Sequence, residues 1–111
     1  MDESEFNQKV DELLTTIEDI IDEIIEEQDL DIDFETAGGI LTLQFEDSSR
    51  IIINRQTPLR QIWVATRSGG FHFAFHPENN QWREEKTGAE LFAELSRHCS
   101  ASAGNDVVLE V

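Results

Sequence analysis

The spacing of apolar residues predicts a long amphipathic helix at the start of the chain. From residue 3 to about residue 27, apolar side chains recur every three or four positions and occupy about 120° of a helical wheel. They are Phe6, Val10, Leu13, Leu14, Ile17, Ile20, Ile21 and Ile24. Asp2, followed three positions later by Glu5, predicts a reciprocal cap at the helix start.

After this helix the apolar pattern changes to the two-residue alternation of strands. Residues 30–35 alternate apolar side chains with acids, and residues 40–46 place Leu41, Leu43 and Phe45 on one side. Further strands are expected at 51–54, 61–66, 71–75 and 81–84, with turns at 37–39, 47–49, 68–70 and 77–80. No connection is long enough for a crossover helix, so we expect an antiparallel meander.

The three central strands, within residues 50–75, have two faces of different character. One face is apolar and comprises Ile51, Ile53, Ile62, Val64, Phe71, Phe73 and Phe75. The other carries Ile52, Asn54, Gln61, Trp63, Ala65 and His72. An indole surrounded by amides resembles the anchor of a binding surface. The alternative, that a loop or its own strand neighbours cover Trp63, stays open at this stage.

A second helix is expected near the end of the chain. Thr87 and Glu90 have capping-box spacing, and Leu91, Phe92, Leu95 and Cys99 form an apolar stripe that ends at 100–104. Residues 106–111 form a tail apolar enough to dock between or along the helices, through Val107, Val108 and Leu109. The sequence therefore predicts a single α+β domain over 1–111, a two-layer α-β sandwich. Two helices would cover one face of a five- to six-stranded antiparallel sheet, leaving the other face in solvent.

The charge balance narrows the classes of partner. Eight basic and 24 acidic residues give a net charge of −16, which opposes binding to nucleic acid and to anionic membranes. Cations and basic protein patches remain as partners. Cys99 is the only cysteine, so neither an intrachain disulfide nor a cysteine-ligated zinc or iron–sulfur site is expected. The first residues resemble no targeting signal, and we expect a cytoplasmic protein.

Acidic residues form two rows along the first helix at i, i+4 spacing. The rows are Glu18-Asp22-Glu26 and Asp19-Glu23-Glu27. Like charges at this spacing destabilise a helix, and acids in its last turns oppose the macrodipole. We interpret the rows as a functional ridge, against the alternative of a merely solvated face. Carboxylates spaced in this way can share a hard cation such as iron, calcium or manganese, or meet a cluster of lysines and arginines.

No catalytic motif stands out from the sequence. It contains no phosphate-binding glycine loop, nucleophile elbow or HExxH motif, and its three histidines, His72, His76 and His98, lie on separate predicted elements or too far apart to chelate together. We therefore expect a protein that is not an enzyme.

Residues 53–66 and 68–73 resemble the signature of the frataxin family. The resemblance rests on the spacing Asn54-Arg55-Gln56-x-Pro58-x-x-Gln61-Ile62-Trp63 and extends over nearly the whole chain. The short chain is most similar to the bacterial CyaY type. The resemblance implies an α-β sandwich with no tightly held cofactor. It also implies weak, exchangeable binding of ferrous and ferric iron and a regulatory role in iron–sulfur cluster assembly.

The resemblance also implies two sets of site residues. The iron-binding acidic ridge, which would also dock on cysteine desulfurase, would be Glu18, Asp19, Asp22, Glu23, Asp29, Asp31 and Asp33. The patch that meets the cluster scaffold protein would be Asn54, Gln56, Gln61 and Trp63. Where family members often carry histidine, this chain has Asn7 and Arg60.

We expect a monomer that iron could drive into oligomers, and a brake on cluster assembly more than an accelerator. Two alternative functions are iron storage or detoxification, and an acidic module that mimics nucleic acid.

Overall fold

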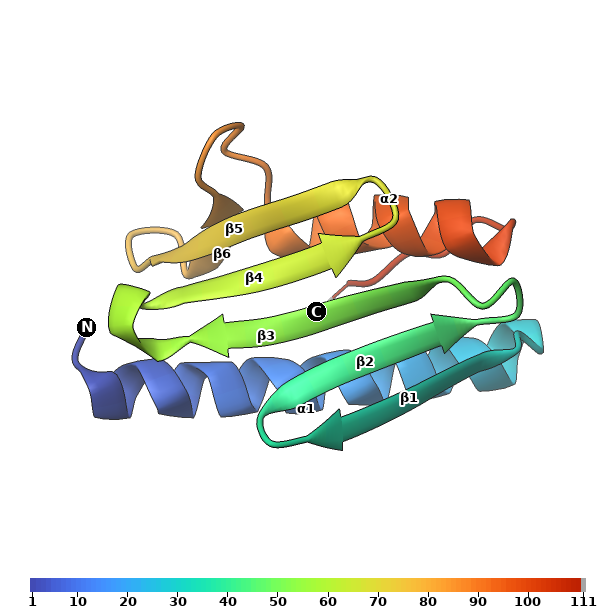
Figure 1. Ribbon diagram of the computed structural model, residues 1–111, viewed down its shortest axis with the longest axis horizontal. Helices are drawn as coiled ribbons and strands as arrows, with labels where there is room; N and C mark the ends of the chain where they lie inside the picture. The colour runs from blue at the N-terminus through green and yellow to red at the C-terminus, as the bar shows by residue number, and fades with distance from the viewer. Residues whose placement is uncertain (111) are drawn as a thin grey trace.

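Two helices cover one face of a six-stranded antiparallel sheet in the computed structural model, which describes residues 1–110 (Figure 1). The strands lie in chain order, so the predicted meander and the α+β sandwich are both confirmed. The helices are α1 (Glu3–Gln28) and α2 (Leu91–Ala103). The strands are β1 (Ile32–Ala37), β2 (Ile40–Phe45), β3 (Arg50–Gln56), β4 (Gln61–Thr66), β5 (Gly69–His76) and β6 (Gln81–Glu84), and a short 3-10 turn, η1 (Thr57–Leu59), joins β3 to β4.

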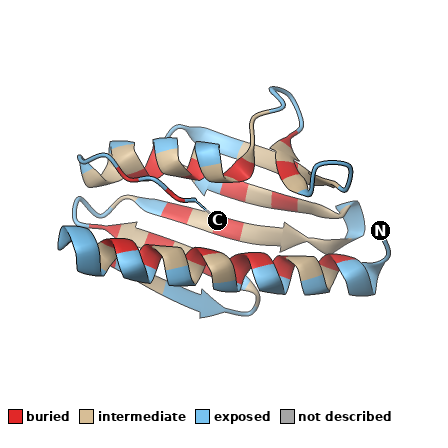
Figure 2. Ribbon diagram, turned by 180° about the vertical axis from the view of Figure 1, so that it is seen from behind, coloured by how far each residue is buried: buried red, intermediate tan, exposed pale blue. Residues whose placement is uncertain are grey.

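Helix α1 has the predicted length and buries the predicted stripe against the sheet (Figure 2). Seven of the eight residues of the predicted stripe are buried, and Ile20 alone among them is partly exposed. The backbone N–H of Glu5 donates to Asp2 Oδ1 at 2.8 Å, as the capping pattern predicts. Burial of this stripe, rather than local propensity, holds the helix in place despite its rows of like charge.

The apolar faces of β2, β3 and β4 meet in register beneath the helices. Ile53 lies opposite Leu41 on one side and Val64 on the other, and all three side chains are buried. Phe73 continues this core in β5, whereas Phe71 and Phe75 pack at its margin. The alternation read from the sequence therefore gave the correct side for each of these residues.

Two predicted strand starts were wrong by two residues. Strand β1 begins at Ile32 rather than at residue 30, because the chain first closes α1: Asp29 adopts a left-handed conformation (φ 51°) and Leu30 N–H bonds to Ile25 C=O at 3.3 Å. Strand β5 begins at Gly69, inside the predicted turn, because Gly69 and Gly70 pair with Thr66 and Ala65 of β4.

The predicted cap of α2 was also wrong. Glu90, not Thr87, is the N-cap, and its carboxylate accepts from the N–H groups of Phe92 (2.7 Å) and Ala93 (3.2 Å). The helix starts late because residues 85–87 first form a turn that brings Glu90 back to pair with Arg83, and Ala89 C=O accepts from Glu84 N–H at 2.8 Å. The buried stripe of α2 consists of Leu91, Leu95, His98 and Cys99, so His98 takes a place that the sequence reading gave to Phe92.

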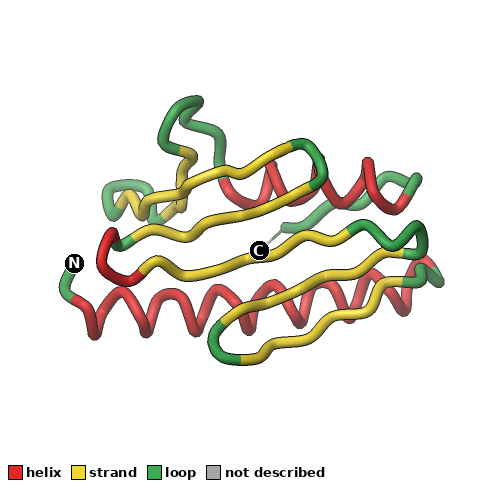
Figure 3. The backbone as a smooth tube through the Cα atoms, in the orientation of Figure 1, coloured by secondary structure: helices red, strands yellow, loops and turns green. Residues whose placement is uncertain are grey.

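The tail docks against α2 as expected, through two of its three apolar residues. Val107 and Leu109 are buried, whereas Val108 is 58 % exposed. Ser100 Oγ accepts from Val107 N–H at 2.9 Å, and Ser96 Oγ accepts from Leu109 N–H at 2.8 Å. Figure 3 follows the tail from the end of α2 back towards the middle of the molecule. Val111, the last residue of the predicted tail, lies outside the described residues.

Candidate functional site

The helical part of the acidic ridge lies on the outer side of α1. Asp19, Asp22 and Glu23 are exposed and Glu18 is partly buried, because the opposite side of the helix packs on the sheet. Within residues 1–110, none of these four carboxylates has a basic side chain within ion-pair distance. Their charges are therefore balanced only by solvent and dissolved ions.

The other three ridge residues follow the chain around the end of α1 to the edge of the sheet. Asp29 is the helix C-cap, Asp31 lies in the connection, and Asp33 is in the edge strand β1. Because Ile32 points into the core, Asp33 points to the opposite, open face of the sheet, where Gln44 is its neighbour. The ridge is thus divided between the helical layer and the open sheet face.

This division determines what kind of cation site the ridge can form. Among residues 1–110, no three side chains of the His, Cys, Asp and Glu types come close enough to hold one metal ion. The donors are exposed carboxylate oxygens, which suit hard cations and leave most of the coordination shell to water. Such an arrangement can attract exchangeable hard cations, and it lacks the enclosed geometry that would select one metal strongly.

The open sheet face holds the second set of candidate residues. Trp63 of β4 lies opposite Asn54 of β3 and His72 of β5, and its indole is partly buried. The His72 ring stacks on the indole, with centroids 4.3 Å apart and an angle of 10° between the planes. The indole Nε1–H of Trp63 donates to Gln61 Oε1 at 2.9 Å. Trp63 is therefore outside the core, yet one of its faces is covered by a strand neighbour.

One participant in this arrangement, Glu85, was not identified from the sequence. Glu85 Oε1 accepts from Gln61 Nε2 at 3.3 Å, and Glu85 Oε2 lies 3.7 Å from His72 Nδ1. Strand parity had placed His72 on the same face as Trp63. That they stack depends on the pairing register of β4 with β5, which parity cannot supply.

The two positions where the family often has histidine serve structural roles here. Asn7 Oδ1 accepts from Arg55 Nη1 at 3.1 Å, beside the ion pair of Arg55 with Asp11. Arg60 takes a left-handed conformation (φ 53°) after η1, and its guanidinium bonds to Thr57 C=O.

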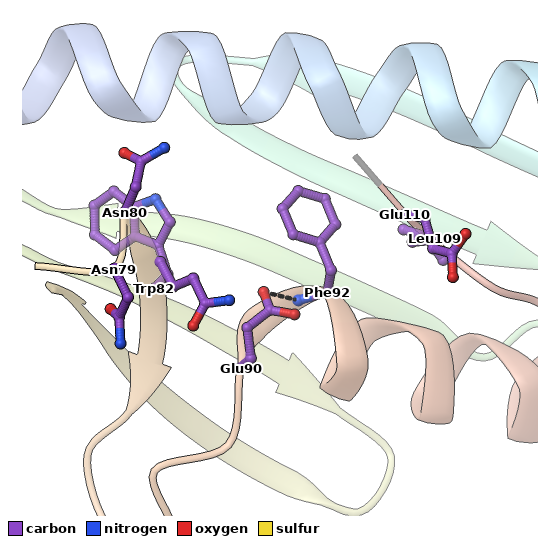
Figure 4. A pocket seen from close by; sticks show the side chains of 8 residues that line it. Asn79, Asn80, Trp82, Glu90, Phe92, Leu109 and Glu110 are labelled. Atoms are coloured by element: carbon purple, nitrogen blue, oxygen red, sulfur yellow. Dashed lines mark hydrogen bonds between the residues drawn. The ribbon is translucent and has the colours of Figure 1, made fainter. Parts of the chain in front are cut away.

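A hollow of about 500 Å³ contains none of the residues of either candidate surface in its lining (Figure 4). It is lined by the β5–β6 turn, the start of α2 and the tail, with Trp82 and Phe92 in its wall. The carboxylate of Glu90 at its rim is already used as the helix cap. Its lining provides no pair of groups arranged as nucleophile and base.

None of the helices within residues 1–110 has the length and apolar character needed to cross a membrane.

Known proteins match this chain over nearly its whole length. The frataxin-like domain family matches residues 1–105. A frataxin from Psychromonas ingrahamii, of the CyaY protein family, is 37% identical, with a TM-score of 0.85 and 100% of each chain covered.

Two yeast structures match with lower identity. A trimeric frataxin from Saccharomyces cerevisiae, complexed with ferrous iron, is 27% identical, with a TM-score of 0.75 and 87% of each chain covered. A further yeast frataxin structure is 25% identical, with a TM-score of 0.72, and the match covers 91% of this chain and 82% of that one. Given the family match over residues 1–105 and the full-length similarity to the Psychromonas protein, the chain belongs to the frataxin family.

Proposed function

We propose that this chain binds ferrous and ferric iron on its acidic ridge and regulates iron–sulfur cluster assembly by docking on cysteine desulfurase and on the scaffold protein. The general function of the frataxin family is an iron-binding, non-enzymatic role in iron–sulfur assembly. The observation that carries the proposal is the set of ridge carboxylates on the outer side of α1, which face solvent without a basic partner in the described chain.

The two surfaces suit two different partners. The ridge presents concentrated negative charge, which suits iron and a basic patch of the desulfurase. The open sheet face is different: Asn54, Gln56 and Gln61 are neutral, and Arg50 and Arg67 border a shallow hollow floored by Ile52 and Ala65. This face suits a less basic partner that can cover Trp63, which is the role we propose for the scaffold protein.

The alternative functions use fewer of these features. Iron storage with ferroxidase activity depends on inward-facing Glu and Glu-x-x-His clusters, whereas the ridge faces outwards. Mimicry of nucleic acid would use the charge of the ridge but would leave the Trp63 face without a role. The trimeric yeast relative complexed with ferrous iron supports iron-driven oligomers of this chain as part of the proposal.

The direct test of iron binding is the thermal stability of the protein in the presence of iron. Iron that binds only the folded chain should add about 1.4 kcal/mol at ten times Kd. The variant Glu18→Gln/Asp19→Asn/Asp22→Asn/Glu23→Gln should lose most of this gain. Calcium or manganese should substitute in part, because exposed oxygen sites discriminate poorly.

The control for this test must remove the same number of charges elsewhere. Glu3→Gln/Glu12→Gln/Asp106→Asn/Glu110→Gln changes four exposed acids outside the ridge and should keep the iron-induced increase in Tm. If the ridge variant kept the whole increase as well, the ridge would not be the iron site.

A further inference from the structure

Four side chains on the open sheet face, including the indole of Trp63, form a closed ring of contacts. His72 stacks on one face of the indole at 4.3 Å, and Gln61 accepts from its N–H at 2.9 Å. Glu85 connects these two residues, because one of its oxygens accepts from Gln61 Nε2 at 3.3 Å and the other lies 3.7 Å from His72 Nδ1. We call Gln61, Trp63, His72 and Glu85 the indole bracket.

The bracket is built on paired backbone rather than on mobile loops. Trp63 and His72 are directly opposed in the β4–β5 ladder. Glu85, the residue after β6, is brought to the same row because its N–H donates to His72 C=O at 2.8 Å. A side chain held in this way loses little further freedom when a partner covers it, which favours binding.

We propose that His72 and Glu85 are positioning residues for Trp63, and that protonation of His72 tightens the bracket, so that docking through the open sheet face strengthens in mildly acidic solution. The docking part rests on the proposed function, whereas the bracket itself does not. A protonated imidazole places a cation over the face of tryptophan, the aromatic ring that attracts cations best. It also forms a charge-assisted contact with the Glu85 carboxylate. Neutral His72 retains the stacking but loses both charged interactions.

The surroundings of His72 leave Glu85 as its principal charged neighbour. Trp63, its neighbour on β4, is uncharged, and within residues 1–110 Glu85 is the only carboxylate within 4.0 Å of the His72 ring nitrogens. Arg83 lies on the same sheet face, but its guanidinium is bonded to Gln81 and to Gly88 C=O. The His72 side chain is 42% exposed and is therefore in contact with solvent. Histidine changes charge between pH 5 and pH 8.

The first test uses the free protein and needs no partner. The two indole N–H signals in a ¹H–¹⁵N spectrum are followed from pH 8 to pH 5. The Trp63 signal should move with the protonation of His72, whereas that of the buried Trp82, 5% exposed, serves as an internal reference. In His72→Phe, which keeps an aromatic ring without a titrating group, the Trp63 signal should stay constant. Titration of Trp63 in His72→Phe that matched the wild type would overturn the proposal.

The second test measures affinity for the scaffold protein at pH 6 and pH 8. The affinity at pH 6 divided by the affinity at pH 8 should be roughly two- to fivefold larger for the wild type than for His72→Phe. This factor corresponds to the free energy of an exposed cation–π contact. Taking this ratio cancels titration of the scaffold and of the ridge. His72→Gln, which removes the ring, should bind more weakly at both pH values, and His72→Phe should restore binding at pH 8.

The two tests separate failure of this proposal from failure of the proposed function. If the indole signal titrates through His72 but the wild type does not bind the scaffold, the docking function is wrong and the bracket stands. If wild type and His72→Phe bind with the same dependence on pH, His72 does not tune the surface.

Discussion

Arg55 of β3 donates to Asp11 of α1 across 2.6 Å, joining two residues that lie 44 positions apart in the chain. The Asp11 side chain is 70% exposed, so solvent screens the pair. We expect Asp11→Asn to lower the free energy of unfolding by about 0.2–1 kcal/mol relative to Glu12→Gln. Both variants remove one negative charge from α1, so the difference between them in urea unfolding isolates the pair. Equal stabilities would show that the contact adds nothing measurable.

Truncation of the two tryptophans should lower the free energy of unfolding by very different amounts. Trp82 is 5% exposed and packs edge-on against Phe6 and Phe75. Trp82→Ala should therefore cost about 3–5 kcal/mol. Trp63→Ala loses the stacking on His72 and should cost only about 1 kcal/mol, while weakening scaffold binding by about 2 kcal/mol or more.

Both variants need a denaturant melt, and Trp63→Ala also needs a titration with scaffold and desulfurase. If Trp63→Ala lost as much stability as Trp82→Ala, or bound as well as the wild type, the open sheet face would lose its proposed role.

Association with the desulfurase should depend on the charge of the ridge. Asp22→Lys/Glu23→Lys should slow association by about tenfold or more at low salt, and added salt should slow the wild type. Asp106→Lys/Glu110→Lys makes the same change in net charge away from the ridge and should have a smaller effect. Association rates that did not respond to ionic strength in stopped-flow measurements would exclude electrostatic steering.

The buried histidine of α2 should make stability depend on pH. Burial, aided by the neighbouring Arg97 guanidinium, lowers the pKa of His98 below its ordinary value of 6.5, and Glu94 offsets this only in part. The unfolded chain therefore binds the proton first. The contribution of His98 is complete above pH 6.5 and is lost as the pH falls below that value towards its folded pKa.

This pH effect can be separated from the titration of the many carboxylates. His98→Phe keeps a ring against Phe71, whose centroid lies 4.9 Å from that of His98, but cannot titrate. Between pH 7.5 and pH 5.5 the wild type should lose more free energy of unfolding than this variant. Parallel pH profiles for the two proteins would assign the effect to other groups.

Much of the fold was already determined by local patterns in the sequence. The stripe from Phe6 to Ile24 and the alternation through Ile51, Ile53, Ile62 and Val64 specify one buried side each, because burial follows the 3.6- and 2-residue periods of helix and strand. The acidic rows of α1 follow from the same periodicity. Element ends were less well determined, since Leu30 closes a helix through its backbone N–H and Glu90 caps one through its carboxylate, and apolar spacing reports neither contact.

The tertiary structure decided which residues meet across elements. Parity placed Trp63 on the open face, but only the register of β4 with β5 stacks it on His72, and only the hydrogen bond from Glu85 N–H to His72 C=O, just after β6, brings Glu85 to the pair. In the same way, the packing of α1 over the sheet joins Arg55 to Asp11, and the core-facing Ile32 sends Asp33 to the open face. Periodicity is a property of one segment, whereas these contacts depend on the relative placement of several segments. That placement is selected by the burial of the whole core.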